Sequence, residues 1–222
     1  MVSILDIIGP IMVGPSSSHT AGACRIGLLT RMLLGGTPER AIIELHGSFA
    51  RTGEGHGTDK ALAGGLLGMR PDDERLRDAL DIMEREGLDY RFEKTTLDDD
   101  AHPNTTRITA TRAGFEAVVV GSSLGAGRIR LTEVNGFPVD ITGSLPTLVL
   151  VAADRPGSIA RIAGVLAEER INLATMRVTR KERGGDAFMV IELDDRPSDD
   201  ATARIGSLDW VRWVRALDKV GA

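Results

Sequence analysis

The sequence has very little cysteine and a shortage of positive charge. Cys24 is the single cysteine among 222 residues, so an intrachain disulfide is excluded, which agrees with a reducing compartment. One thiol also cannot supply the four ligands of an iron–sulfur cluster. The 27 basic residues are outnumbered by 32 acidic ones, and the formal net charge is -5. This balance argues against a nucleic-acid partner, because nucleic-acid surfaces normally show a basic excess.

Long apolar runs are absent too. No stretch is long enough to cross a bilayer, and no basic region precedes the apolar residues of the N-terminus, as a signal peptide requires. We therefore expect a cytoplasmic protein without a membrane partner. The apolar and charged fractions of 42% and 27% are typical of a globular chain, and the length fits one large domain or two small ones.

A change of pattern near residue 146 divides the chain. Gly143, Ser144 and Pro146 interrupt the apolar pattern there, and proline disfavours helix at the residue before it. Beyond this point the apolar spacing predicts the order strand, helix, strand, strand, helix, strand, which is the ferredoxin-like βαββαβ arrangement. We expect these six elements over 147–153, 158–171, 172–181, 188–193, 199–208 and 211–217.

The residues before this boundary predict a mixed domain. Helices are expected over 20–34, 58–68 and 71–87, one strand over 40–48, and several more strands between 90 and 134. The predicted fold class is therefore α+β, with a first domain over residues 1–145 and a βαββαβ domain over residues 147–222.

The stretch GPSSSHTAG, residues 14–22, places four hydroxyls and a histidine at the start of a predicted helix. Helix N-termini carry unpaired N–H groups and the positive end of the dipole, so they bind anions, and an imidazole adds a proton carrier. The candidate ligands for a carboxylate or phosphate are Ser16, Ser17, Ser18, His19 and Thr20. The alternative is ordinary N-capping, which explains one hydroxyl but does not require four.

The stretch HGSFARTGEGHGTD, residues 46–59, is a second candidate site, with a glycine-rich loop between a strand and a helix. Glycines allow backbone N–H groups to approach a ligand closely. Its polar candidates are His46, Ser48, Thr52, His56, Thr58 and Asp59. The alternative is a mobile loop in which Asp59 caps the next helix. Zinc binding by His46 and His56 is disfavoured, because their spacing matches no standard zinc motif.

Three further features are weaker. The stretch DDDAHPNT, residues 98–105, holds the last histidine, His102, and is otherwise typical of a solvated acidic turn. The stretch DRPGS, residues 154–158, leads into a helix and either holds a small amino acid or only connects two elements. Cys24 lies among apolar residues of a predicted helix, which favours a small buried side chain.

The motifs GPSSSHTAG, LHGSFARTGEGHGTD and HPNT, in this order, resemble the β chain of the iron–sulfur-dependent L-serine dehydratases, also called L-serine ammonia-lyases. The resemblance covers the first two thirds of the chain. It is specific because three separate motifs occur in the right order. The C-terminal part resembles an ACT domain, which the β chains of the two-subunit form carry.

The resemblance implies a reaction and two partners. The family removes ammonia from L-serine to give pyruvate, and it uses a 4Fe–4S cluster held by cysteines of a separate α chain. The single cysteine of this chain agrees with a cluster that is held by the α chain alone. The expected partners are the α chain, the substrate L-serine and a second copy of this chain, which would pair through either domain.

Carried over to this sequence, the resemblance assigns proton transfer or orientation to His19 and His56. It implies no metal ligand in this chain, and Cys24 is not expected to bind the cluster. Substrate binding is expected from Ser16, Ser17, Ser18, Thr20, His46, Ser48, Asp59, His102 and Asn104. A regulatory amino acid would bind Asp154, Arg155, Pro156, Gly157 and Ser158.

Two other functions are compatible with the sequence. The first domain also resembles the allosteric substrate-binding domains of some phosphoglycerate dehydrogenases, which would make the chain a non-catalytic serine or amino-acid sensor. A dimerising scaffold whose ACT sheets pair edge to edge is the third possibility. A neighbouring gene for a cysteine-bearing α chain would favour the enzyme.

Overall fold

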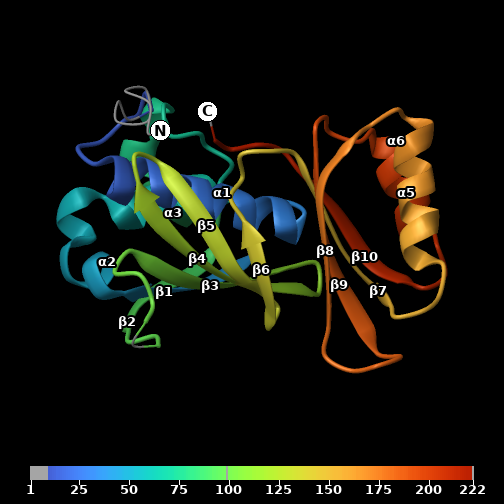
Figure 1. The fold of residues 1–222 in the computed structure, drawn as a ribbon. Helices are drawn as coiled ribbons and strands as arrows, with labels where there is room; N and C mark the ends of the chain where they lie inside the picture. The colour runs from blue at the N-terminus through green and yellow to red at the C-terminus, as the bar shows by residue number, and fades with distance from the viewer. Residues whose placement is uncertain (1–9, 99, 222) are drawn as a thin grey trace, which may run out of the picture.

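Two β-sheets, one in each half of the chain, organise the fold (Figure 1). The computed structural model describes residues 10–98 and 100–221. Residues 1–9 of the predicted first domain, Asp99 and the last residue, Ala222, lie outside this description. The predicted α+β class is confirmed.

The first sheet has six strands in the order β2-β1-β3-β4-β5-β6. Only β1 and β2 pair in parallel within it, and the other neighbours are antiparallel. The strands are β1 (Arg40–His46), β2 (Asp89–Thr95), β3 (Thr105–Arg112), β4 (Phe115–Gly125), β5 (Arg128–Val134) and β6 (Phe137–Ile141). Along β1, Ala41, Ile43 and Leu45 are buried while their neighbours are more exposed, as expected for a sheet with one covered face.

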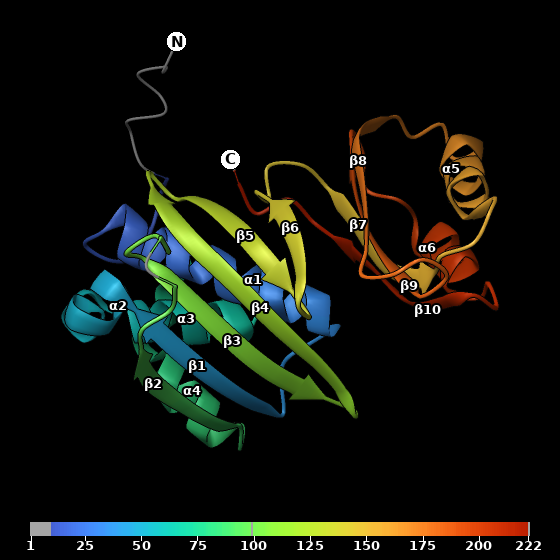
Figure 2. The ribbon, with the colours of Figure 1, turned by 60° about the horizontal axis from the view of Figure 1, so that its bottom comes forward.

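Helices cover one face of this sheet (Figure 2). They are α1 (Ala23–Leu34), α2 (Gly47–Thr52), α3 (Thr58–Leu66) and α4 (Ala79–Arg85). A π-helical turn, Ser17–Gly22, precedes α1, and 3₁₀ turns at Glu54–His56 and Glu74–Asp78 precede α3 and α4. The loop predicted between residues 46 and 59 is therefore largely helical, which corrects that expectation, and the strand before it ends at His46 rather than at Ser48.

Two glycines allow α1 and α3 to pack closely. A Cβ atom on Gly65 would lie 2.1 Å from the Cys24 carbonyl oxygen, and one on Gly27 would lie 2.4 Å from the Leu62 carbonyl oxygen. Any larger residue would force the two backbones apart. The segments that lead into α1 and α3 carry His19 and His56, whose rings lie next to each other.

Cys24 lies inside this packing as a buried side chain, as predicted. Its thiol donates a hydrogen bond to the Met69 carbonyl at 3.3 Å, and burial raises the pKa of the thiol to about 12. The thiol is therefore held protonated and out of reach of solvent.

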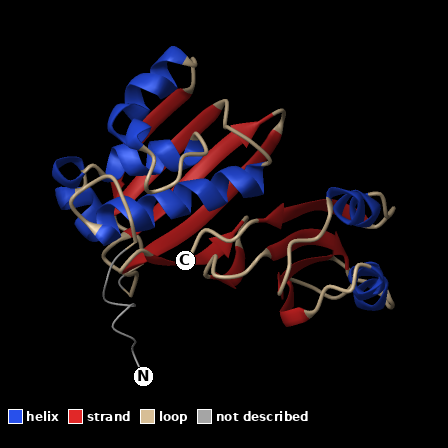
Figure 3. Cartoon of the chain, turned by 90° about the horizontal axis from the view of Figure 1, so that it is seen from above, coloured by secondary structure: helices blue, strands red, loops and turns tan. Residues whose placement is uncertain are grey.

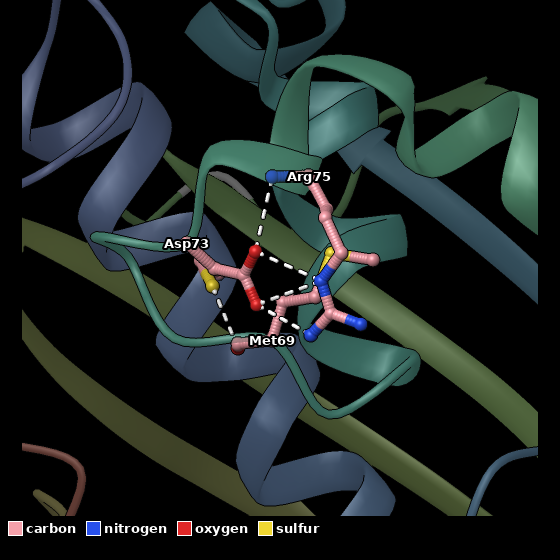
Figure 4. A network of polar contacts seen from close by, with 4 residues as sticks. Met69, Asp73 and Arg75 are labelled. Atoms are coloured by element: carbon pink, nitrogen blue, oxygen red, sulfur yellow. Dashed lines mark hydrogen bonds and ion pairs between the residues drawn. The ribbon is translucent and has the colours of Figure 1, made fainter.

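Figure 4 shows the loop after Met69, where the Asp73 carboxylate accepts hydrogen bonds from the main-chain nitrogen and guanidinium of Arg75.

The second sheet has the predicted ferredoxin-like order of elements. Its strands lie in the order β10-β7-β9-β8, and two helices cover the face turned away from the first domain (Figure 3). The elements are β7 (Thr147–Ala153), α5 (Ser158–Glu168), β8 (Leu173–Arg180), β9 (Asp186–Leu193), α6 (Asp199–Gly206) and β10 (Val211–Leu217). β6 ends at Ile141 and β7 begins at Thr147, and we propose that the boundary between the two domains lies in this connection.

The other face of the second sheet packs on the first domain through aromatic side chains. Phe188 is fully buried and stacks on Phe137, with ring centroids 5.1 Å apart. Trp213 lies edge-on to Phe188 at 5.8 Å and to Phe115 at 5.6 Å. The two halves therefore share one hydrophobic core at this contact.

Candidate active site

His19 lies in the π-helical turn that leads into α1, and two serines of its own motif hold it. Ser16 has an extended backbone and is the N-cap of the turn, and its Oγ accepts a hydrogen bond from the His19 main-chain nitrogen at 3.2 Å. Ser18 Oγ lies 3.2 Å from Ser16 Oγ and 3.3 Å from His19 Nδ1. The capping alternative is thus correct for one serine, while a second supports the imidazole.

Helix α2 brings two more hydroxyls to the opposite nitrogen of the same ring. His19 Nε2 lies 3.3 Å from Ser48 Oγ and 3.2 Å from Thr52 Oγ1. Phe49, between them in sequence, is buried and meets the His19 ring edge-on at 5.3 Å. Four residues therefore hold the imidazole: Ser18 at Nδ1, Ser48 and Thr52 at Nε2, and Phe49 against the ring.

His56 lies next to His19, with ring centroids 4.9 Å apart. Its Nδ1 is 2.9 Å from the Thr52 carbonyl oxygen. A carbonyl oxygen only accepts hydrogen bonds, so Nδ1 carries the proton in the neutral ring and Nε2 has a lone pair available. His56 is exposed, so this lone pair is placed to accept a proton from a bound molecule.

Burial and the neighbouring His56 both favour the neutral form of His19. Burial lowers the pKa of the His19 imidazole, and the neighbouring His56 lowers the pKa further, against a smaller opposing effect of the Ser48 main chain. Two imidazolium rings at this distance would repel each other. The pair therefore offers a neutral, hydrogen-bonded ring beside an exposed ring with an open acceptor.

The HPNT motif, residues 102–105, contacts the stretch 46–59 at the start of α2. The Ser48 main-chain nitrogen donates to the Pro103 carbonyl oxygen at 2.6 Å. The Asn104 main-chain nitrogen donates to His102 Nδ1 at 3.1 Å, and Thr105 Oγ1 donates to the His102 carbonyl oxygen at 2.6 Å. The HPN turn is therefore anchored beside α2, although no hydrogen bond links the His102 ring to His19 or His56 among the described residues.

A cavity of 370 Å³ opens beside His56. Its walls include Thr20, the glycines at 55 and 57, Lys60 and Arg77. The Thr20 hydroxyl is buried and has no hydrogen-bond partner within the described part of the chain. Glu54 lines the same cavity. A small molecule that carries both a negative and a positive group therefore suits this combination of an unpaired hydroxyl, two cations, one carboxylate and an imidazole.

Besides Thr20 and His102, four predicted substrate-binding residues are not part of the hydrogen-bonded cluster around His19. His46 Nδ1 accepts a hydrogen bond from the Leu97 main-chain nitrogen at 3.1 Å and lines a different hollow with Arg51 and Lys94. Asp59 Oδ1 accepts from the Lys60 main-chain nitrogen in the first turn of α3. Ser17 forms no side-chain hydrogen bond among residues 10–98 and 100–221, and Asn104 Oδ1 is buried without a partner in that same set.

The predicted regulatory turn lies in the second domain. Asp154 Oδ2 accepts hydrogen bonds from Arg180 Nη1 at 2.6 Å and from the Gly184 main-chain nitrogen at 3.1 Å. The Arg155 guanidinium lies over the Trp210 ring, and Ser158 begins α5 after Gly157, whose φ is 85°. Thr52 was named from the sequence as a polar candidate but was assigned no role, and Lys60 was not named. The signal for Thr52 was its i, i+4 spacing to both Ser48 and His56.

The residues of this chain do not fit an iron–sulfur cluster. Cys24 is the single thiol, and it is buried and protonated, whereas cluster ligands are thiolates. The described segments also hold no group of three His, Cys, Asp or Glu side chains arranged to bind a metal ion. Within the same segments no helix combines the length and apolar character that a bilayer crossing needs.

Loss of stability in acid is expected from His19. The folded-state pKa lies below the ordinary value of 6.5, so the unfolded chain takes up the proton first as the pH falls. The contribution of neutral His19 is therefore present above pH 6.5 and is lost as the pH falls through the lowered folded value. Urea unfolding of the wild type and His19→Asn across this range measures it. The free energy of unfolding should change less steeply with pH in His19→Asn than in the wild type. Equal slopes in the two proteins would contradict a lowered pKa of His19.

These features define an α+β protein in which the His19–His56 pair is a candidate acid–base site. Residues 3–134 match the family described as "Serine dehydratase beta chain", and residues 147–209 match the ACT domain. The chain belongs to the serine dehydratase β-chain family, and the expected resemblance is confirmed.

Curated relatives agree with this assignment. The chain is 47% identical over 200 residues to a "Probable L-serine dehydratase, beta chain" of Bacillus subtilis (strain 168), covering 89% of each chain. It is 36% identical to the "L-serine dehydratase, beta chain" of Peptoniphilus asaccharolyticus, over 86% of this chain and 87% of that one. A D-3-phosphoglycerate dehydrogenase of Synechocystis is 28% identical over 84% of this chain but only 34% of its own length.

Proposed function

We propose that this chain supplies the proton-transferring half of an L-serine ammonia-lyase and works only together with an α chain. The observation that carries the proposal is the His19–His56 pair, in which one neutral ring is fixed on both nitrogens and the other presents an unprotonated Nε2. The reaction begins with removal of a carbon-bound proton, which needs such an acceptor.

His56 Nε2 takes the Cα proton of L-serine. The Cβ–O bond then breaks, and the leaving hydroxide takes the proton held on His56 Nε2 and departs as water, which returns His56 to its neutral form. The resulting 2-aminoacrylate tautomerises to the imine, which water hydrolyses to pyruvate and ammonia. The cavity residues Thr20 and Lys60 bind the substrate carboxylate, because an unpaired hydroxyl and an ammonium group both donate hydrogen bonds to it.

The site is open to solvent in the single chain. Thr52 and His56 are both exposed, although proton abstraction from carbon benefits from exclusion of water. We propose that the α chain covers this face and holds the 4Fe–4S cluster through its own cysteines, because Cys24 is unsuited to that role. The assembly would be cytoplasmic, with a second copy of this chain and a regulatory amino acid bound at Asp154–Ser158.

The purified chain alone is expected to bind no cluster and to form no pyruvate from L-serine. Anaerobic treatment with iron and sulfide should give no stable broad absorption, because one buried thiol cannot hold four irons. Co-expression with the α chain of the same organism should give pyruvate from L-serine. A cluster with four irons on the isolated chain, or full activity without the α chain, would contradict the proposal.

The sensor function keeps one observation in its favour, the similarity of most of this chain to a part of the phosphoglycerate dehydrogenase. A sensor would bind L-serine without converting it. Calorimetric titration of the isolated chain with L-serine, combined with the pyruvate assay of the co-expressed pair, distinguishes the two. Tight binding with no pyruvate from the assembled pair would favour the sensor.

A further inference from the structure

We propose that Thr52 is a positioning residue that sets which ring nitrogen carries the proton in both histidines of the pair. Its hydroxyl reaches His19 and its carbonyl reaches His56, at 3.2 and 2.9 Å. The effect on catalysis rests on the proposed function, whereas the effect on the imidazoles is a property of this chain alone.

The direction of the hydrogen bonds follows from counting protons. The Thr52 hydroxyl has one proton, and it is donated to the Ser48 carbonyl oxygen at 3.0 Å. Toward His19 Nε2 the Thr52 oxygen can therefore only accept, so Nε2 carries the ring proton. His19 Nδ1 must then be the acceptor in its contact with Ser18.

The serines on the other side of the ring agree with this assignment. The His19 main-chain nitrogen donates to Ser16 Oγ, so the Ser16 proton is available for Ser18 Oγ. The Ser18 proton is in turn available for His19 Nδ1. In this assignment the Ser16, Ser18 and Thr52 hydroxyls each donate one hydrogen bond and accept one from the groups named, so no two donors or two acceptors face each other. The opposite tautomer would place an N–H on Nδ1 and reverse this chain of donors.

The two histidines are thus held in opposite tautomers by one residue. His19 is protonated on Nε2 and His56 on Nδ1. The open acceptor of the pair is therefore His56 Nε2, while both nitrogens of His19 are occupied. Without the Thr52 hydroxyl, His19 Nε2 could instead accept from Ser48 Oγ, which lies 3.3 Å away. The proton on His19 would then be free to move to Nδ1.

Nitrogen-15 spectra of histidine-labelled chain at about pH 8, above the ordinary histidine pKa, test this directly. The signals of His19 are assigned by their loss in His19→Asn. The wild type should show a protonated Nε2 and an unprotonated Nδ1 for His19. Thr52→Val, which keeps the shape but removes the hydroxyl, should shift His19 toward a mixture of tautomers. Thr52→Ser should restore the wild-type spectrum.

Thr202→Val is the matched control. Thr202 Oγ1 donates to the Ser198 carbonyl oxygen at 2.9 Å, the same i−4 bond on exposed α6 in the second domain. Its loss tests the general effect of removing such a bond from a helix and should leave the His19 signals unchanged. A wild-type His19 protonated on Nδ1, or a Thr52→Val spectrum identical to the wild type, would overturn the proposal.

The assembled pair provides the second readout. Thr52→Val should lower kcat by about tenfold or more with little change in KM, since misplaced catalytic groups affect the reaction more than substrate binding. Thr52→Ser and Thr202→Val should retain activity. If the spectra change as expected but the wild-type pair makes no pyruvate, the positioning role stands and the proposed function fails. Unchanged kinetics of Thr52→Val in an active pair would overturn the catalytic part.

Discussion

Replacing His56 with glutamine in the assembled pair should lower kcat/KM for L-serine by about a hundredfold or more, the scale of a lost acid–base group. Glutamine can keep a hydrogen bond to the Thr52 carbonyl through its NH₂ group. It cannot accept a proton from carbon. The side chain of His56 is exposed, so the change removes no core packing.

Steady-state pyruvate formation measures this effect, and melting temperature and α-chain binding serve as controls for folding and assembly. His19→Asn should also reduce activity. The double variant should be little worse than the stronger single one, because residues that act as a unit lose their contributions together. A His56→Gln pair that assembles normally and keeps near-full activity would refute the assignment of the base and favour a sensor.

Replacing Phe188 with alanine should lower the free energy of unfolding by about 3–5 kcal/mol, the usual cost of removing a fully buried aromatic ring. The ring is 1% exposed and lies between Phe137 of the first domain and Trp213 of the second. Its loss leaves a cavity at the place where the two sheets meet. The stability of both domains should therefore fall together.

Urea unfolding followed by circular dichroism and by tryptophan fluorescence measures this, because Trp210 and Trp213 both lie in the second domain. Phe92→Ala is the matched control, since Phe92 is only partly buried and lies on β2 at the edge of the first sheet. The control should cost clearly less. A loss below about 1 kcal/mol for Phe188→Ala would mean that the contact between the sheets contributes little.

The second domain was largely predictable because its signals are local. The run Thr147–Ala153 is apolar, the spacing of Ile162 and Leu166 is helical, and turn residues separate the elements. Each strand and helix is therefore recognisable from its own residues, and the βαββαβ order follows. Packing on the first domain was not predictable, because it depends on side chains far apart in the sequence, such as Phe137 and Phe188.

The candidate site was predicted in its residue types but not in its arrangement. His19 and His56 were singled out, yet their proximity depends on the contact of α1 with α3 at Gly27 and Gly65, which no short pattern encodes. The glycine-rich stretch was expected to be a loop, but Gly53 adopts a right-handed helical conformation, and the left-handed residue that ends the turns is Gly57. Composition alone cannot separate these cases.

The burial of Cys24 has a practical consequence for the assembled protein. A thiol reagent at neutral pH reacts with thiolates, and this thiol is both shielded and protonated in the folded chain. In a complex with a cysteine-bearing subunit, modification under native conditions would therefore report on the other subunit's cysteines. Modification of Cys24 would instead mark molecules in which the α1–α3 packing has opened, so one residue distinguishes damage to the partner from unfolding of this chain.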